Sequence, residues 1–206
     1  MLGRPSELNA VMISIRALVR RHRWQAGGYA LVTGSASGLG RAIAQQLASQ
    51  GCTLALVDRD ARGNAQTLAL LPAAAVRRAA SEAAGHSVHT VDVASAADWS
   101  ALFDDLRGRW PRIDWLVNCA GVCGAGEIGE FPLADWQWLL DINLLGVIQG
   151  CHTFVPWLRE NSGAARIVNI ASVAAIAAAP SMAAYNVAKA GVVALSETLY
   201  AELRPQ

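Results

Sequence analysis

Five short runs of apolar residues, each followed by a stretch with helical character, constrain the fold more than any other feature of the sequence. The runs are continuous rather than alternating, which is typical of strands that are buried on both faces. Strands that alternate with helices along a chain usually form a parallel sheet through right-handed crossovers. The pattern therefore predicts an α/β protein built on a doubly wound parallel sheet.

The expected elements begin after Gly27-Gly28, a pair typical of a boundary. We therefore expect a single domain over residues 28–206 and an N-terminal extension over residues 1–27. The strands are expected at 29–33, 53–58, 87–93, within 113–121 and at 166–172. The helices are expected at 39–49, 96–109, 133–159 and 183–203, with a further helical stretch interrupted at Pro72.

The N-terminal extension is basic and amphipathic. Between residues 10 and 23 the apolar side chains fall on one helical face and arginines on another. Such a segment suits a transit peptide or a membrane-surface helix. It equally suits an accessory helix docked on the domain or on a partner subunit, or a gene start placed too early.

Charge and composition exclude several functional classes. A net charge of +1 does not suggest a nucleic-acid partner. No uninterrupted apolar run reaches the roughly 18 residues of a membrane span, so none is expected. The four cysteines follow neither a zinc pattern nor a disulfide framework, which predicts free thiols, no metal site and a cytoplasmic protein.

A glycine-rich turn follows the first strand and opens the first helix. Glycines there allow a tight turn, and the helix directs its N-terminal N–H groups at phosphates. Asp58 ends the second strand, 18 residues after Gly40, where a carboxylate accepts hydrogen bonds from a ribose. It favours NAD over NADP, although Arg59 beside it partly offsets the repulsion of a 2′-phosphate. The residues of the turn expected to bind the cofactor are Gly34, Ser35, Ser37, Gly38, Leu39 and Gly40.

A second constellation lies near the end of the chain. Lys189 is the only lysine, and an ammonium has donors and a tunable charge that arginine lacks. Tyr185 lies four residues earlier, so the two side chains share one face of a helix. With Ser172, they form a group able to move a proton.

Together these motifs resemble the short-chain dehydrogenase/reductase family, over roughly residues 28–206 and in the simple form with TGxxxGxG and YxxxK motifs. Asp92-Val93 is similar to the family's adenine-contacting pair. Asn118-Cys119-Ala120-Gly121 resembles its NNAG element, with a cysteine in place of the second asparagine. Asn143 matches its helical catalytic asparagine. The resemblance implies a Rossmann-like fold in which Asp92, Val93, Asn118, Ala120, Gly121, Tyr185 and Lys189 contact the cofactor.

The resemblance also implies an enzyme, an oxidoreductase that transfers a hydride between NAD, or alternatively NADP, and a secondary alcohol or ketone. Tyr185 exchanges the proton, and Lys189 stabilises its phenolate and bonds the nicotinamide ribose. Ser172 holds the substrate oxygen, and Asn143 positions a relay water. Ala174 and Met182 flank the substrate together with Ser172 and Tyr185, which suggests a lipophilic or modest carbonyl or alcohol. A homo-oligomer, dimer or tetramer, is expected from the family.

In the family, two more strands and a substrate lid follow the helix that carries the tyrosine and lysine. This sequence stops at Gln206, so we expect a sheet without those last two strands and with an exposed fifth strand. A shortened gene, a protein completed by another chain and a non-catalytic remnant all fit. The alternative to an enzyme is thus a truncated, non-catalytic nucleotide-binding or interaction protein.

Overall fold

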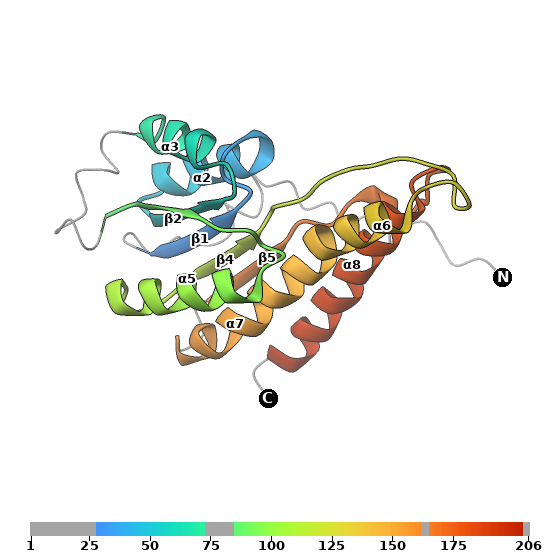
Figure 1. Cartoon of the computed structure of the whole chain (residues 1–206). Coiled ribbons are helices and arrows are strands. Elements are labelled where there is room, and N and C mark those ends of the chain that lie inside the picture. The colour runs from blue at the N-terminus through green and yellow to red at the C-terminus, as the bar shows by residue number, and fades with distance from the viewer. Residues whose placement is uncertain (1–27, 73–84, 162–164, 204–206) are drawn as a thin grey trace.

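A parallel sheet of five strands, in the order β3-β2-β1-β4-β5, forms the centre of the molecule (Figure 1). The computed structural model describes residues 28–72, 85–161 and 165–203; the N-terminal extension expected over residues 1–27 lies outside them. The order steps outward from β1 in both directions, as the doubly wound prediction requires. The strands are β1 (Tyr29–Thr33), β2 (Thr53–Asp58), β3 (Ser87–Thr90), β4 (Trp115–Asn118) and β5 (Arg166–Asn169).

Helices cover both faces of this sheet. Helices α2 and α3 lie on one face, and α5, α7 and α8 on the other (Figure 1). Their bounds are α2 (Gly38–Ser49), α3 (Ala61–Ala69), α5 (Ala96–Arg109), α6 (Leu133–Leu140), a π-helical turn (Asp141–Leu145), α7 (Gly146–Glu160), a 3₁₀ turn (Val173–Ala175) and α8 (Ala183–Leu203). The α/β prediction is therefore confirmed.

Side-chain caps begin two of these helices. The Asp60 carboxylate accepts a hydrogen bond from the N–H of Gly63 at 3.0 Å, at the start of α3. The Ser95 hydroxyl accepts from the N–H of Asp98 at 3.2 Å, at the start of α5. Each cap satisfies a backbone donor that has no partner inside its own helix. Helix α2 differs from both, because it begins without a side-chain cap.

Two strands are shorter than the sequence suggested. Strand β3 ends at Thr90, opposite Asp58 of β2, and β5 ends at Asn169, opposite Asn118 of β4. The expected strands at 87–93 and 166–172 thus each continued three residues too far. Only the first residue of each segment still bonds the neighbouring strand: the N–H of Val91 donates to the Asp58 carbonyl at 3.1 Å, and that of Ile170 to the Asn118 carbonyl at 2.9 Å. The residues that follow rise above the carboxyl edge of the sheet. Asp92 and Ser172 both lie in these rising segments.

The hydrophobic core divides into two clusters, one on each face of the sheet. Trp99, Phe154 and Trp157 dominate the face covered by α5, α7 and α8. Their rings pack against one another with centroids 6.0 Å and 6.2 Å apart. Aliphatic side chains, among them Ile43 and Leu47, fill most of the opposite face below α2, together with the Trp115 ring. Helix α2 can therefore approach the sheet closely, which brings its N-terminus to the strand ends.

One helix in the described part of the chain is long and apolar enough to cross a membrane on length and composition alone. It runs from Leu133 to Glu160, with a mean hydropathy of 1.2. Its apolar side chains also belong to the hydrophobic core, where Phe154, Trp157 and Leu158 are buried. The helix packs against the sheet, α5 and α8, so it is no clear membrane span.

Candidate functional site

The turn Gly34–Gly40, which we call the phosphate turn, joins β1 to α2 at the carboxyl edge of the sheet. Gly34 has φ +68°, and a Cβ on it would lie 2.8 Å from the backbone of Ala120. A Cβ on Gly40 would collide with the carbonyl oxygen of Gly34. Both glycines therefore allow segments of backbone to approach each other closely.

Gly38 is required for a different reason. Its φ is +50°, yet nothing lies within 4 Å of where its Cβ would be. The open space is a cavity of about 370 Å³, lined in part by Ser37, Leu39 and Gly40. Helix α2 points its uncapped N-terminus at this space. The first N–H groups of a helix have no partner within the helix, and with the positive end of the helix dipole they favour an anionic group in such a space.

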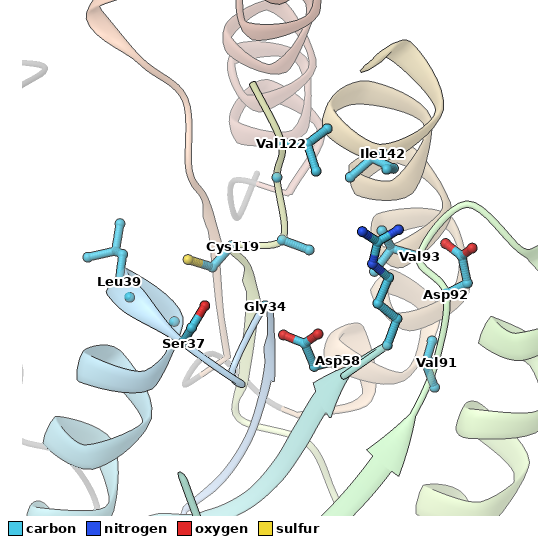
Figure 2. A pocket seen from close by; sticks show the side chains of 15 residues that line it. Gly34, Ser37, Leu39, Asp58, Val91, Asp92, Val93, Cys119, Val122 and Ile142 are labelled. Carbon is cyan, nitrogen blue, oxygen red and sulfur yellow. The ribbon is translucent and has the colours of Figure 1, made fainter. Parts of the chain in front are cut away.

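Segments from the carboxyl ends of neighbouring strands complete the cavity (Figure 2). Asp58 and Arg59 come from the end of β2. Beyond the phosphate turn, the lining consists of Asp58, Arg59, Val91, Asp92, Val93, Cys119, Ala120, Gly121, Val122 and Ile142. The structure thus brings together most of the cofactor-binding positions predicted ahead of the Tyr185 helix, and Gly34, Ser37, Gly38, Leu39 and Gly40 are among them.

The Asp58 carboxylate and the Ser37 hydroxyl both point into the cavity (Figure 2). One oxygen accepts the N–H of Ala36 at 3.0 Å, and the other accepts the N–H of Asp60 at 2.9 Å. These bonds fix the orientation of the carboxylate. A carboxylate has about four acceptor sites, so the group keeps the capacity to bind hydroxyls of a ligand.

Asp92 and Val93 lie on the opposite wall. The Asp92 carboxylate accepts the N–H of Ala94 at 2.9 Å, and the Val93 carbonyl accepts the indole N–H of Trp99 at 2.9 Å. Gly146 packs against Val93, because a Cβ on it would lie 3.0 Å from a Val93 methyl. The wall is therefore held by α5 and α7.

Four of the predicted cofactor positions do not line the cavity. The hydroxyl of Ser35 is fully buried and donates to Asn64 Oδ1 at 2.6 Å, on the side of the turn facing away from the cavity. Asn118 is also buried, and its amide donates to Asn169 Oδ1 at 2.8 Å across β4 and β5. Asn118 faces away because alternate residues along strand β4 point to opposite faces of the sheet. Tyr185 and Lys189 also lie outside the lining of this cavity.

Val91, Cys119, Val122 and Ile142 line the cavity without having been predicted as cofactor contacts. Val91 and Ile142 each precede a predicted residue by one position, so the motifs that identified Asp92 and Asn143 were the only sequence pattern pointing to this part of the wall. Burial raises the pKa of the Cys119 thiol to about 11, although the Lys189 ammonium opposes this. The thiol is therefore a neutral wall group.

Lys189 and Tyr185 meet on one face of α8, as their spacing predicted. The ammonium lies 5.7 Å from the centroid of the Tyr185 ring and donates to the carbonyl of Ile170 at 2.8 Å. It is only 4% exposed. Burial lowers the pKa of Lys189 below its ordinary value, while Cys119 acts in the opposite direction.

Asn143 lies in the π-helical turn between α6 and α7. Its amide nitrogen donates to the carbonyls of Val122 and Leu139, both at 3.0 Å. Its amide oxygen accepts the N–H of Val122 at 3.1 Å. Asn143 thereby fixes the backbone that follows β4. Single π-helical turns inside α-helices are frequent at functional sites.

Gly121 connects these groups to the cavity. It is one of the lining residues, and a Cβ on it would lie 2.8 Å from Asn143 Oδ1 and 3.7 Å from Lys189 Nζ. The amide and the ammonium therefore both approach the cavity wall at Gly121, next to Val122, which lies across the cavity from Asp58 (Figure 2). A ligand that extends from Asp58 along the phosphate turn would reach them at Gly121.

The remaining predicted residues belong to the segment between β5 and α8. The Ser172 hydroxyl accepts the N–H of Ala174 at 3.2 Å and begins the 3₁₀ turn, which packs against α8. Ala174 is buried, and Met182 is half-buried just before α8. Among the described residues no hydrogen bond joins Ser172 to Tyr185. The structure thus places these side chains near the start of α8 but outside the cavity.

Comparison with known proteins agrees with this arrangement. The chain is 40% identical to D-threitol dehydrogenase of Mycolicibacterium smegmatis over 176 residues, which are 85% of this chain and 64% of that protein. It is 37% identical to 2-dehydro-3-deoxy-L-rhamnonate dehydrogenase (NAD(+)) of a Sphingomonas species, covering 86% of this chain and 67% of that protein.

A crystal structure of a short-chain dehydrogenase/reductase from Burkholderia phymatum in complex with NAD superimposes with a TM-score of 0.76. It is 39% identical, over 86% of this chain and 60% of that one. The chain therefore spans about two thirds of the length of these relatives. The family profile described as short chain dehydrogenase matches residues 28–206. The chain belongs to the short-chain dehydrogenase family.

Proposed function

We propose that this chain carries the dinucleotide site and proton-transfer residues of an oxidoreductase that interconverts a secondary alcohol and a ketone. One observation carries the proposal: Lys189 and Asn143 both approach Gly121, on the wall of the cavity that the phosphate turn and Asp58 line. The phosphate turn, the open space at Gly38 and the Asp58 carboxylate all fit a nicotinamide dinucleotide. When bound, such a cofactor supplies the hydride chemistry.

Tyr185 is the proposed acid and base. A phenol with a reference pKa near 10 needs help to lose its proton at neutral pH. Its proposed partner is the Lys189 ammonium, which lies 5.7 Å from the ring centroid on the same face of α8. Asn143 keeps the loop of Gly121 and Val122 in place, and its proposed further role is to position a relay water.

Ser172 is proposed to hold the substrate oxygen as a neutral hydrogen-bond donor. Its oxygen already accepts the N–H of Ala174, so the hydroxyl proton is free to be donated to a substrate. Ala174 and Met182 add small and apolar surface beside it. The names of two relatives, D-threitol dehydrogenase and a rhamnonate dehydrogenase, make small polyols and sugar acids the first substrates to test.

NAD is the proposed cofactor, with NADP as the alternative. The support is the negative charge of Asp58 inside the cavity, which repels a 2′-phosphate, together with the NAD in the Burkholderia structure. We also propose a cytoplasmic homo-oligomer. The described cysteines are free thiols, as expected in a reducing compartment.

The test is a fluorescence titration with NADH followed by turnover assays with NAD and a panel of polyols, sugar acids and secondary alcohols. Binding with turnover supports the enzyme. Binding without turnover on any substrate favours the alternative, a non-catalytic nucleotide-binding protein. No binding of either NADH or NADPH contradicts the proposal.

A further inference from the structure

Side chains behind the phosphate turn, on the face away from the cavity, have no part in the proposed binding and proton-transfer roles. Arg41, in the first turn of α2, is central among them. Its Nη2 donates to the carbonyls of Ala36 and Gly63, and its Nε donates to the Thr67 hydroxyl at 2.8 Å. One guanidinium thus joins the phosphate turn, α2 and α3.

Helix α3 supplies the rest of this support. The Thr67 hydroxyl donates to the Ser35 carbonyl at 2.8 Å, and Asn64 Oδ1 accepts the Ser35 hydroxyl at 2.6 Å. Asn64 is itself anchored to β2, because its amide donates to the Leu56 carbonyl at 2.8 Å. Ser35, Asn64 and Thr67 are fully buried. Such buried, satisfied hydrogen bonds hold a segment in a single arrangement.

Gly63 makes the close approach of α3 to the turn possible. A Cβ on Gly63 would lie 2.9 Å from the Ala36 Cβ and 3.1 Å from the Ala36 carbonyl oxygen. The carbonyl of Ala36 is thereby confined between α3 and the Arg41 guanidinium. It cannot rotate toward the cavity without breaking the bond to Arg41.

These contacts determine where two backbone N–H groups point. In a planar trans peptide the C=O and the N–H point in opposite directions. With the Ser35 carbonyl bonded to Thr67, the N–H of Ala36 points the other way and reaches Asp58 Oδ2 at 3.0 Å. With the Ala36 carbonyl bonded to Arg41, the N–H of Ser37 is directed away from Arg41, to the side where Ser37 lines the cavity.

The positive charge of Arg41 also contributes to the potential at the phosphate turn. All its hydrogen-bond acceptors are neutral, and no carboxylate within the described ranges lies within 4.0 Å of the guanidinium. Its positive field therefore adds to that of the α2 N-terminus. A lysine would keep the charge, but it lacks the planar fork that reaches Ala36 and Thr67 together.

We infer that Arg41 is a positioning residue for the pyrophosphate of a bound nicotinamide dinucleotide. It holds the Ala36 carbonyl behind the phosphate turn, presents the Ser37 N–H to the phosphates and adds positive potential beneath them. Thr67 acts through Arg41 and through Ser35, and Asn64 acts through Ser35. The inference rests on the proposed function, since it concerns the same dinucleotide site.

The test compares NADH dissociation constants of the wild-type chain, Arg41→Ala and Arg41→Lys by fluorescence titration. Losing hydrogen bonds from a charged group is expected to weaken NADH binding about 10- to 100-fold in Arg41→Ala. Arg41→Lys is expected to lie between Arg41→Ala and the wild type. Arg62→Ala is the matched control, because Arg62 is an exposed arginine of neighbouring α3, and its affinity should equal that of the wild type.

Two further readouts separate positioning from a purely structural role. Millimolar guanidinium chloride should restore part of the NADH affinity of Arg41→Ala and should not strengthen binding by Arg62→Ala. Where turnover is measurable, Arg41→Ala should raise the KM for NAD. Its kcat at saturating NAD should stay within about twofold of the wild type, because Arg41 is not one of the proposed proton-transfer residues.

The outcomes distinguish this inference from the proposed function. A wild-type chain that binds NADH, with Arg41→Ala binding within about twofold, overturns the role of Arg41 and leaves the proposed function standing. A wild-type chain that binds neither NADH nor NADPH overturns both. If Arg41→Ala does not fold, Thr67→Val decides: it removes the hydroxyl that bonds Arg41 and Ser35, and an unchanged dissociation constant overturns the inference.

Discussion

Replacing Gly121 with alanine tests the geometry of the proposed site most directly. The backbone of Gly121 is outside the left-handed region, so an alanine is strained only by its Cβ. That atom would lie 2.8 Å from Asn143 Oδ1, where an ordinary contact needs about 3.4 Å or more. Asn143 or the loop must therefore move by about half an ångström.

The cost follows from how firmly Asn143 is held. Its three hydrogen bonds, at 3.0, 3.0 and 3.1 Å, connect it to Val122 and Leu139, so it has no free direction in which to move. Overpacking of such a site costs about 1–3 kcal/mol of stability. Since Lys189 Nζ lies 3.7 Å from the same Cβ, the shift also displaces proton-transfer groups, and a loss of about 10- to 100-fold in kcat is expected.

Urea unfolding measures the free energy of unfolding, and turnover with saturating NAD measures kcat. Gly108→Ala is the matched control, because Gly108 lies in α5 with nothing within 4 Å of its Cβ position. That control should stabilise the chain by up to about 1 kcal/mol and leave kcat unchanged. A Gly121→Ala variant as stable as the wild type would refute the close packing of Gly121 against Asn143. A less stable variant with unchanged kcat would refute the functional part of the reasoning.

Three other substitutions test separate parts of the site and the core. Tyr185→Phe should abolish turnover while NADH affinity stays near that of the wild type; full activity would contradict the proposed acid and base. Asp58→Ala should weaken NAD binding and reduce the preference for NAD over NADP, and unchanged selectivity would oppose the role of Asp58. Burial raises the pKa of Cys52 from 9.0 to about 12, so the folded chain keeps this proton while the unfolded chain loses it. Stability should therefore fall by up to about 1.4 kcal/mol per pH unit above about pH 9, in urea unfolding at rising pH. Cys52→Ala should reduce that slope, and an equal slope in both proteins would contradict the assignment.

The order of the elements and most of the cavity could be predicted from the sequence, because they depend on local patterns. The apolar runs and the glycine spacing determine where strands end and where α2 begins. Asp58 follows its strand directly, so the position of the strand settled the position of the carboxylate. Tyr185 and Lys189 lie four residues apart on one helix, and that spacing alone brought them together.

The features that could not be predicted depend on contacts between distant segments. Ser35 and Ser37 are equally polar in the sequence, and only the packing of α3 behind the turn shows that Ser35 faces Asn64. The ends of β3 and β5 were extended too far, because strand length depends on the neighbouring strand. The support given by Arg41 joins residues 26 positions apart, from Arg41 to Thr67. No local pattern indicates such a contact.

The π-helical turn at Asp141–Leu145 determines how the long helix from Leu133 to Glu160 responds to the loss of a residue. Each residue removed from a helix rotates the remainder of the helix by about 100° and shortens it by about 1.5 Å. A π-helical turn holds one residue more than an α-helical turn, so Asn143 and Phe154 face directions that an uninterrupted α-helix of the same length would not give them. The two ends of one rod thus pack against different neighbours, and the wider turn is the joint that reconciles their phases. A gap of one residue in α7 would therefore change which way half of the helix faces, whereas a gap in the wider turn would be absorbed by closing it to an ordinary α-helical turn.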